Sequence, residues 1–157
     1  MSKLIEGQKA PQFILPGSTG GNINFKDYRT KNIVVLYFYP KDMTSGCIRE
    51  ACSFRDLSSE FEAAGAVILG VSTDDMNSHA GFAQAHRLNF PLLSDVDARV
   101  SSAYGVYVEQ GRYRHTFMGI ERTTFVIDKS GTIRKIYIHI NVDRHADEVL
   151  EFVRGLE

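Results

Sequence analysis

The sequence predicts an α/β fold in which helices flank a mixed central sheet and a β-hairpin extension precedes it at the N-terminus. Two continuous apolar runs, over residues 33–39 and 66–72, have the length and β-branched content of strands buried on both faces of a sheet. Residues at helical spacing separate the two runs, which is the pattern of a right-handed βαβ unit. A third observation is the strand-turn-strand pattern over residues 123–138, which extends the sheet before a final helix. A length of 157 residues suits one domain, and we expect a single domain over residues 1–157.

A glycine-rich turn near the N-terminus separates two short extended pieces. The pieces cover residues 10–16 and 23–25, and the turn between them contains Gly17, Gly20 and Gly21. This pattern predicts a peripheral hairpin. We expect a single helical turn to follow it over residues 25–29.

Both cysteines follow the first buried strand, which Pro40 ends. We expect one helix from near Gly46 to Gly65, because apolar residues recur there at helical spacing and glycine is a favoured terminator. Cys47 lies in the first turn, where unpaired N–H groups and the positive end of the helix dipole favour a thiolate over a thiol. The residues that define the spacing are Cys47, Ile48, Ala51, Phe54, Leu57, Phe61 and Ala64.

The second half of the chain alternates short helices and strands. After a run of capping residues, Phe82, Ala83 and His86 predict a helix that ends before Asn89. The pattern then predicts a short extended piece over residues 91–95, two helical turns over 98–104, and a strand over 106–113 that enters a turn. In the hairpin over 123–138 the second strand alternates at its start, so we expect it to be half exposed, near a sheet edge. The last helix has its apolar residues at Ala146, Val149, Leu150, Val153 and Leu156.

Charge and cysteine content limit the classes of function. The formal net charge is −1 and acids and bases are interspersed, so no footprint for nucleic acid or an anionic membrane is present. The N-terminal residues lack the apolar core of a signal peptide, and no apolar stretch reaches the roughly 18 residues of a membrane span. We therefore expect a cytoplasmic protein. In that reducing compartment two cysteines are more often catalytic or redox-active than structural.

Cys47 has two interpretations. Free cysteine is among the most buried residue types, so an isolated Cys47 is a small hydrophobe. The preceding buried strand, Thr44 three residues before it and Cys52 five residues after it instead favour a reactive-thiol site. Four residues separate the cysteines, so the Cys-x-x-Cys motif of dithiol reductases is absent.

Two βαβ-like passages, a hairpin and a terminal helix follow the element order of a thioredoxin-like fold with an N-terminal extension. Within it, the signature Tyr39-Pro40-x-x-x-Thr44-x-x-Cys47, with Cys52 five residues later, resembles the active site of the peroxiredoxins of the Q type, also called bacterioferritin comigratory proteins. The resemblance spans nearly the whole chain. Further matching segments are Gly7-x-x-Ala10-Pro11-x-Phe13, residues 35–42, 70–72, 90–95 and 104–106, and Arg122-x-Thr124-Phe125-Val126-Ile127-Asp128.

The resemblance implies a thiol peroxidase that reduces hydrogen peroxide and organic hydroperoxides. It assigns the attacking thiolate to Cys47, which becomes a sulfenic acid, and it assigns the donors to the peroxide oxygens to Thr44 and Arg122. Glu50 would orient Arg122. Taken singly, Thr44 is equally an ordinary helix N-cap, Arg122 a solvated cation at a strand end and Glu50 a partner of the helix dipole. The signature also implies supporting roles for Tyr39, Pro40 and Gly46.

By the same resemblance, Cys52 is the resolving cysteine. It would condense with the sulfenic acid to an intramolecular disulfide, later reduced by thioredoxin or a similar dithiol protein. We expect a monomer or a weak homodimer, with no nucleic-acid or membrane partner, no organic cofactor and no metal. The histidines show no ligand spacing with the cysteines and are expected to be surface or packing residues: His79, His86, His115, His139 and His145.

Two residues depart from the family pattern, which usually has proline at Ser45 and threonine at Ile48. Ser45 removes a φ restraint, so we expect a less preorganised loop and slower peroxide turnover. An alternative function is a non-enzymatic redox sensor or holdase, in which a disulfide between Cys47 and Cys52 switches a binding surface. If residues 47–52 are helical when reduced, their end Cα atoms are about 8.6 Å apart, beyond the roughly 7 Å that a disulfide bridges. Disulfide formation then requires local unwinding.

Overall fold

The structure is a computed structural model that describes residues 4–112 and 114–156. Tyr113, the last residue of the strand predicted over 106–113, lies outside the described residues. Residues 1–3 and 157, at the ends of the expected domain, also lie outside the described residues. Residues 1–3 begin the N-terminal segment that was compared with a signal peptide.

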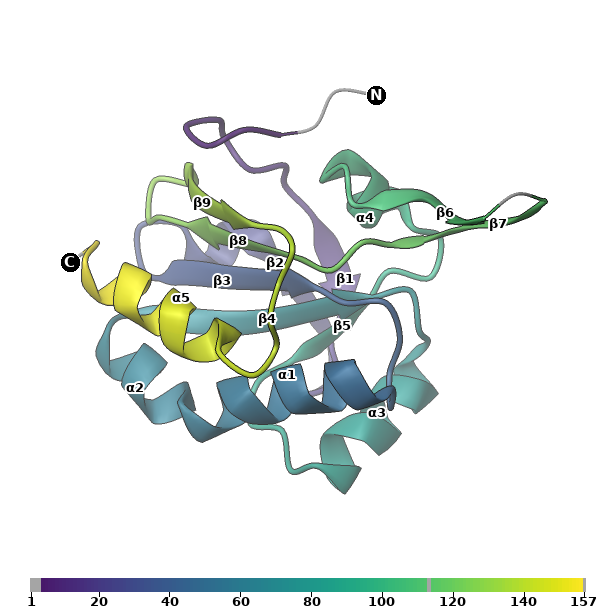
Figure 1. Cartoon of the computed structure of the whole chain (residues 1–157). Coiled ribbons are helices and arrows are strands. Elements are labelled where there is room, and N and C mark those ends of the chain that lie inside the picture. The colour runs from purple at the N-terminus through teal and green to yellow at the C-terminus, as the bar shows by residue number, and fades with distance from the viewer. Residues whose placement is uncertain (1–3, 113, 157) are drawn as a thin grey trace.

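A five-stranded mixed sheet forms the centre of the protein, with the strand order β5-β4-β3-β8-β9 (Figure 1). The two predicted apolar runs are β3 (Ile33–Phe38) and β4 (Ala66–Ser72), which pair in parallel, and β5 (Leu92–Ser94) continues in parallel beyond β4. On the other side, β8 (Thr123–Ile127) lies antiparallel to β3 and β9 (Ile133–Tyr137) antiparallel to β8. The expected mixed sheet is confirmed, and β9 is an edge strand as predicted.

Side chains of β3 are buried on both faces of the sheet, and they alternate between two core clusters. Val35 and Tyr37 pack in the cluster that contains residues of α1 (Ser45–Asp56), while Leu36 and Phe38 pack in the opposite cluster with Tyr104. The first cluster also holds residues of the other long helices, α3 (Met76–Ala85) and α5 (His145–Arg154), and of the short α2 (Ser58–Ala63). In Figure 1, α1 and α2 run along one side of the sheet with α5 beside them.

The prediction of one helix from Gly46 to Gly65 is wrong, because the chain leaves helical geometry at Leu57. That residue has φ −104° and ψ 7° and caps the end of α1 and the start of α2. Its N–H group bonds the carbonyl of Phe54 in a tight turn, and the serines that follow favour helix caps over helix interiors. Apolar spacing continues through the break, since Phe54 and Phe61 are both fully buried and their rings lie 5.8 Å apart.

A second difference concerns the strand predicted over 106–113. It is β6 (Tyr107–Arg112), and it forms a two-stranded ribbon with an unpredicted strand, β7 (His115–Ile120). Most of β7 is exposed, so it lacks the apolar alternation by which a strand is recognised. The ribbon extends away from the sheet (Figure 1), and β6 requires a glycine at position 111, where φ is 101° and a Cβ atom would collide with the His115 carbonyl oxygen.

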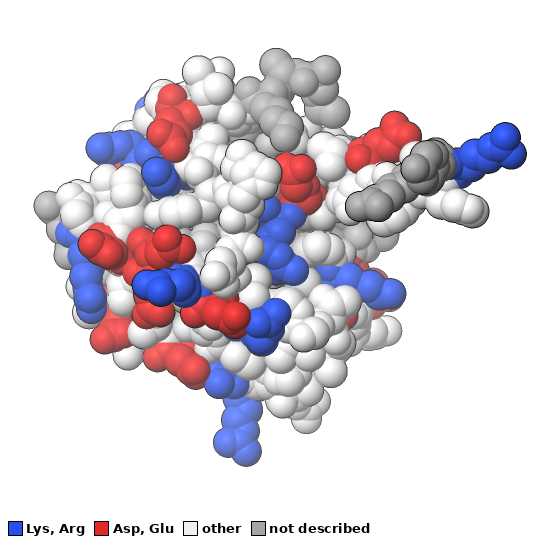
Figure 2. Space-filling view, viewed as in Figure 1, with Lys and Arg blue, Asp and Glu red and all other residues white. Residues whose placement is uncertain are grey.

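The N-terminal prediction is confirmed. Strands β1 (Ile14–Pro16) and β2 (Asn22–Asn24) form an antiparallel hairpin, and the 3-10 helix η1 (Phe25–Tyr28) follows it. The short helix α4 (Arg99–Ala103) precedes the β6–β7 ribbon. On the face in Figure 2, acidic and basic side chains are interspersed. Among the described residues, no helix is long and apolar enough to cross a membrane.

Candidate active site

Cys47 lies where the carboxyl end of β3 meets the start of α1. Ser45 is the first residue of α1, so Cys47 is in the first helical turn, as the sequence predicts. Both cysteines are free thiols. Cys47 is only 1% exposed and packs in the same core cluster as Ala51 and Phe54. A buried sulfur at a helix N-terminus combines the positive end of the dipole with low solvent screening.

The sheet register brings Arg122 to this sulfur. Thr123, the first residue of β8, pairs with Phe38, the last residue of β3, so Arg122 enters beside the end of β3. Its Nη2 donates to the Cys47 Sγ over 3.3 Å. Gly46 leaves the necessary space, since a Cβ atom there would lie 3.2 Å from Nη2. A guanidinium at this distance stabilises negative charge on the sulfur.

Glu50 holds the same guanidinium from the other side. It is one helical turn after Cys47 on α1, and Arg122 Nη1 donates to its Oε1 over 2.5 Å. Glu50 is 1% exposed, and its Oε2 has no hydrogen-bond partner among the residues that the structure describes. Burial raises the pKa of Glu50 to about 7, although Arg122 pulls that pKa downward. The Arg122 side chain is therefore fixed by a carboxyl group that changes charge near neutral pH.

His145, at the start of α5, faces this carboxyl group. Its Nε2 lies 4.0 Å from Glu50 Oε2 and 2.7 Å from the hydroxyl of Thr124 in β8. Burial and the neighbouring Arg122 lower the pKa of His145 to about 4. His145 is thus neutral around pH 7 and does not neutralise Glu50.

Thr44 occupies the N-cap position of α1 but does not cap it with its side chain. Its backbone carbonyl accepts the N–H of Ile48 over 2.8 Å, whereas its hydroxyl donates to the carbonyl of Lys41 over 2.9 Å. For the Thr44 hydroxyl to be the donor that the sequence resemblance implies, it must rotate away from the Lys41 carbonyl. The preceding residue, Met43, has φ 65° in the left-handed region, which turns the chain sharply into the helix.

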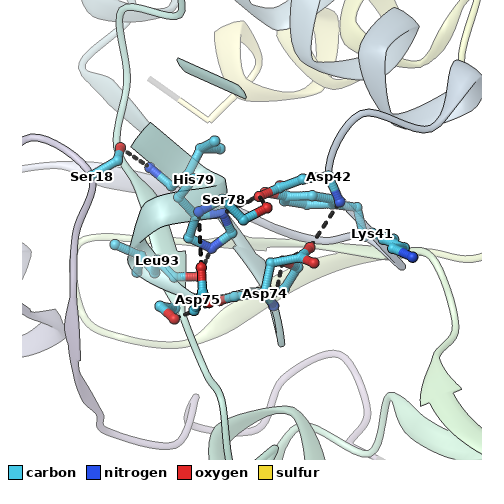
Figure 3. Close-up of polar contacts among 12 residues, drawn as sticks. Ser18, Lys41, Asp42, Asp74, Asp75, Ser78, His79 and Leu93 are labelled. Carbon is cyan, nitrogen blue, oxygen red and sulfur yellow. Dashed lines mark hydrogen bonds and ion pairs between the residues drawn. The ribbon is translucent and has the colours of Figure 1, made fainter. Parts of the chain in front are cut away.

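A buried polar network anchors the loop between Pro40 and Cys47 (Figure 3). Asp42 is 5% exposed and its carboxylate accepts from Tyr39 (2.6 Å), Ser78 (2.7 Å) and His79 (2.7 Å). The other ring nitrogen of His79 lies 2.9 Å from the carbonyl of Leu93. The His79 ring is therefore held between the Asp42 carboxylate and the backbone of β5.

This network sets the charge of Asp42 and joins distant elements. Burial raises the pKa of the Asp42 carboxyl, but the hydrogen bonds from His79, Tyr39 and Ser78 outweigh burial and lower it below 3.8. The Asp42 N–H group also donates to Asp74 over 2.8 Å, at the end of β4 (Figure 3). The loop is therefore tied to β4, α3 and β5.

The supporting residues named from the signature divide into two groups. Gly46 lies against Arg122, while Tyr39 bonds Asp42 rather than Cys47. Pro40 follows β3 and is exposed. Sequence reasoning missed Asp42 and left His79 and His145 among surface or packing residues, although both histidines are buried and hydrogen-bonded.

Cys52 lies on the same helix as Cys47, and α1 is continuous between them. It is partly buried and its Sγ lies 3.9 Å from Nδ1 of His86, at the end of α3. The helical geometry assumed for residues 47–52 is confirmed, so their Cα atoms are about 8.6 Å apart in this state. Within the described part of the chain, no group of three or more His, Cys, Asp or Glu residues could hold a metal ion.

Comparisons with known proteins find similar sequences and similar structures over nearly the whole chain. The model of the AhpC/TSA family matches residues 6–136. A putative peroxiredoxin bcp of Coxiella burnetii is 47% identical over 144 residues, which are 92% of this chain and 95% of that protein. A crystal structure of a Xylella fastidiosa PrxQ mutant has a TM-score of 0.92 at 34% identity and covers 99% of both chains. A structure of the Xanthomonas campestris bacterioferritin comigratory protein, described in terms of alkyl peroxide reduction, has a TM-score of 0.87 at 36% identity, covering 92% of this chain and 91% of that one.

Proposed function

The chain belongs to the AhpC/TSA family, among peroxiredoxins of the Bcp type, and from that premise we propose that it reduces hydroperoxides with Cys47 as the attacking thiol. The carrying observation is the contact between Arg122 Nη2 and Cys47 Sγ, 3.3 Å long, on a guanidinium that Glu50 fixes. The Cys47 thiolate attacks one peroxide oxygen, the O–O bond breaks, and the other oxygen leaves as hydroxide or alkoxide. The product is a sulfenic acid on Cys47.

Arg122 has two roles in this reaction. It stabilises the thiolate before attack, and its Nη2 lies where the peroxide oxygens must approach the sulfur. Thr44 is the second donor to the peroxide, after rotation of its hydroxyl from the Lys41 carbonyl. Tyr39 and Pro40 act indirectly, by setting the course of the loop that carries Thr44. Gly46 acts by leaving room for the guanidinium.

Cys52 resolves the sulfenic acid. Its thiolate forms a disulfide with Cys47 and releases the sulfenic oxygen as water, after which thioredoxin or a similar dithiol protein reduces the disulfide. Because α1 holds the two Cα atoms about 8.6 Å apart, the first turns of the helix must unwind before the bond forms. Unwinding also removes the Cys47 sulfur from Arg122, so oxidation and resolution take place in different conformations.

The partners and compartment belong to the same proposal. Hydrogen peroxide and organic hydroperoxides are the substrates, and the protein acts in the cytoplasm as a monomer or a weak homodimer. Support comes from the two free thiols, which suit a reducing compartment. The interspersed charges in Figure 2 argue against a polyanionic partner on that face.

The test is peroxide consumption by the purified protein with a thioredoxin, thioredoxin reductase and NADPH system. Cys47→Ser should abolish it, because an alcohol replaces the thiolate. Cys52→Ser should complete one turnover and stop at the sulfenic acid. Arg122→Ala should slow Cys47 oxidation by about 2–4 kcal/mol of lost transition-state stabilisation. Appreciable peroxidase activity of Cys47→Ser refutes the assignment.

A redox sensor or holdase that uses the same disulfide is the second candidate, favoured by the unwinding that disulfide formation imposes on α1. Turnover number separates the two functions. A sensor consumes one equivalent of peroxide and then changes its binding surface, whereas a peroxidase continues as long as NADPH is supplied.

A further inference from the structure

We propose that His86 is the base that activates Cys52, accepting the thiol proton when Cys52 attacks the oxidised Cys47. The proposal rests on the proposed function, because it assigns a residue to the resolving step of that reaction. It starts from the contact between Cys52 Sγ and His86 Nδ1, 3.9 Å long, which is within the range of a hydrogen bond to sulfur.

The position of His86 is held from two directions. It is the C-cap residue of α3, where its N–H group bonds the carbonyls of Phe82 and Gln84, and its ring packs edge-on against Phe82 with centroids 5.5 Å apart. Arg55, three residues after Cys52 on α1, donates from Nη1 to the His86 carbonyl over 2.7 Å. This bond joins the end of α3 to the part of α1 that carries Cys52.

Arg55 adds a positive charge to the same place. Its guanidinium interacts electrostatically with Cys52, in addition to its bonds with Asp56. A cation near a cysteine is a recognised feature of reactive thiol sites, and a neutral imidazole at hydrogen-bond distance can accept a thiol proton. Cys52 therefore lies beside both a guanidinium and an imidazole, although it is far from the first turn of α1 and from the positive end of the helix dipole.

The two halves of α1 are attached by different contacts. At the start, Thr44 makes no side-chain cap and Ser45 is exposed, while the buried Cys47 and Glu50 are held by Arg122. Further on, Ala51 and Phe54 are fully buried and Arg55 is bonded to α3. Since disulfide formation requires the first turns to unwind, Cys47 moves toward Cys52 as the helix opens from Ser45. Because Cys52 stays in the half that is bonded to α3, its contact with His86 persists during resolution.

The chemical step is balanced as follows. The Cys52 Sγ–H bond breaks and its proton goes to Nδ1 of His86, which requires the tautomer with its own proton on Nε2. The Cys52 thiolate attacks the Cys47 sulfur, the S–S bond forms and the S–OH bond breaks. The leaving hydroxide takes a proton from the imidazolium and departs as water. Cys52 is oxidised, the Cys47 sulfur is reduced from the sulfenic level, and peroxide is the source of the oxidising equivalents.

The first measurement does not depend on peroxidase activity. In a Cys47→Ser background, iodoacetamide labels Cys52, and the labelling rate is followed from pH 5.5 to 9 with His86 present and with His86→Asn. Asparagine can hydrogen-bond near the place of Nδ1 but cannot accept a proton. We expect labelling at pH 7 to fall by about fivefold or more and the pH profile to move to higher pH. His115→Asn, on the exposed ribbon strand β7, is the matched control and should leave the profile unchanged.

The second measurement follows the two steps of the reaction separately. With both cysteines present, His86→Asn should leave the rate of Cys47 oxidation unchanged and slow disulfide formation by about tenfold or more near pH 7. Added imidazole should partly restore disulfide formation in His86→Ala, which a purely structural role does not explain. Identical labelling profiles with and without His86 overturn the proposal. If Cys52 labelling depends on His86 but Cys47 does not react with peroxide, the proposed function fails while His86 remains an activator of Cys52.

Discussion

Glu50 and His145 face each other over 4.0 Å, and they should make the stability of the protein depend on pH in opposite senses. Burial raises the pKa of Glu50 from 4.5 to about 7, although Arg122 opposes the rise. A rise of that size corresponds to about 3 kcal/mol of unfolding free energy. Because the folded-state pKa is the higher one, this contribution is fully present below pH 4.5 and is lost as the pH rises through about 7.

His145 contributes with the opposite sign. Burial, followed by the positive charge of Arg122, lowers its pKa from 6.5 to about 4. This contribution to stability, again about 3 kcal/mol, is present above pH 6.5 and is lost as the pH falls through about 4. The two groups titrate over the same range of pH, so between pH 4.5 and 6.5 their effects nearly cancel in the wild-type protein.

Substituting either Glu50 or His145 should reveal the pH dependence of stability that the remaining residue causes. Urea unfolding is measured from pH 4.5 to 8.5 for wild type, Glu50→Gln and His145→Asn. Relative to wild type, Glu50→Gln should gain about 3 kcal/mol as the pH rises across this range. His145→Asn should gain a similar amount as the pH falls. Exposed Glu62 supplies the control Glu62→Gln, whose difference from wild type should stay constant. A pH-independent difference for Glu50→Gln would refute the argument.

Three further substitutions test the loop and the start of α1. Ser45→Pro places proline at the first helical position after Thr44, whose ψ of 151° suits a residue before proline. It should stabilise the fold by about 0.4–1 kcal/mol and increase the amount of sulfinic acid on Cys47 at high peroxide. An unchanged midpoint of overoxidation, measured by mass spectrometry, counts against this prediction. Gly46→Ala should stabilise the helix by about 0.5–1 kcal/mol. Its added Cβ atom, 3.2 Å from Arg122 Nη2, should nevertheless slow Cys47 oxidation about fivefold in stopped-flow measurements. An unchanged rate would mean that the guanidinium moves freely. Asp42→Asn should lower the unfolding free energy by about 3 kcal/mol at pH 7. The difference from wild type should shrink below pH 3.8, because the wild-type carboxyl then becomes protonated. A difference that persists in acid would show that the charge of Asp42 does not cause the stabilisation.

The central sheet was predictable because its information is local. The runs that became β3 and β4 are almost entirely apolar, as burial on both faces of a sheet requires. The break at Leu57 was not predictable from spacing, because Phe54 and Phe61 remain on one side of the core whether or not the helix is continuous. Strand β7 was missed because it is stabilised by pairing with β6 and not by burial.

In the candidate site, the sequence pointed only to residues of the segments that resemble the family pattern. Cys47, Thr44 and Glu50 lie within one short segment, and Arg122 was assigned through the resemblance of the second segment. Residues that act on this segment from other elements carry no local pattern. Asp42, His79 and His145 become important because burial removes their water and leaves specific partners, and a sequence gives neither burial nor partners.

In the proposed reaction, the contact between Arg122 and Cys47 that prepares the thiol for attack also keeps α1 closed. As a thiolate, the sulfur accepts a charge-assisted hydrogen bond from Arg122 Nη2, and that bond resists removal of Cys47 from its place in the first turn. Oxidation to a neutral sulfenic acid weakens the bond to about half its strength, a loss of about 1 kcal/mol.

Opening of the helix should therefore become about fivefold more favourable once the sulfur has reacted. In a Cys52→Ser variant, where the sulfenic acid persists, amide exchange of residues 45–50 should accelerate by that factor after one equivalent of peroxide, while exchange around Phe54 stays constant. In Arg122→Ala the acceleration should disappear, because the contact that oxidation weakens is already absent. Equal acceleration with and without Arg122 would place the trigger for opening elsewhere in the helix.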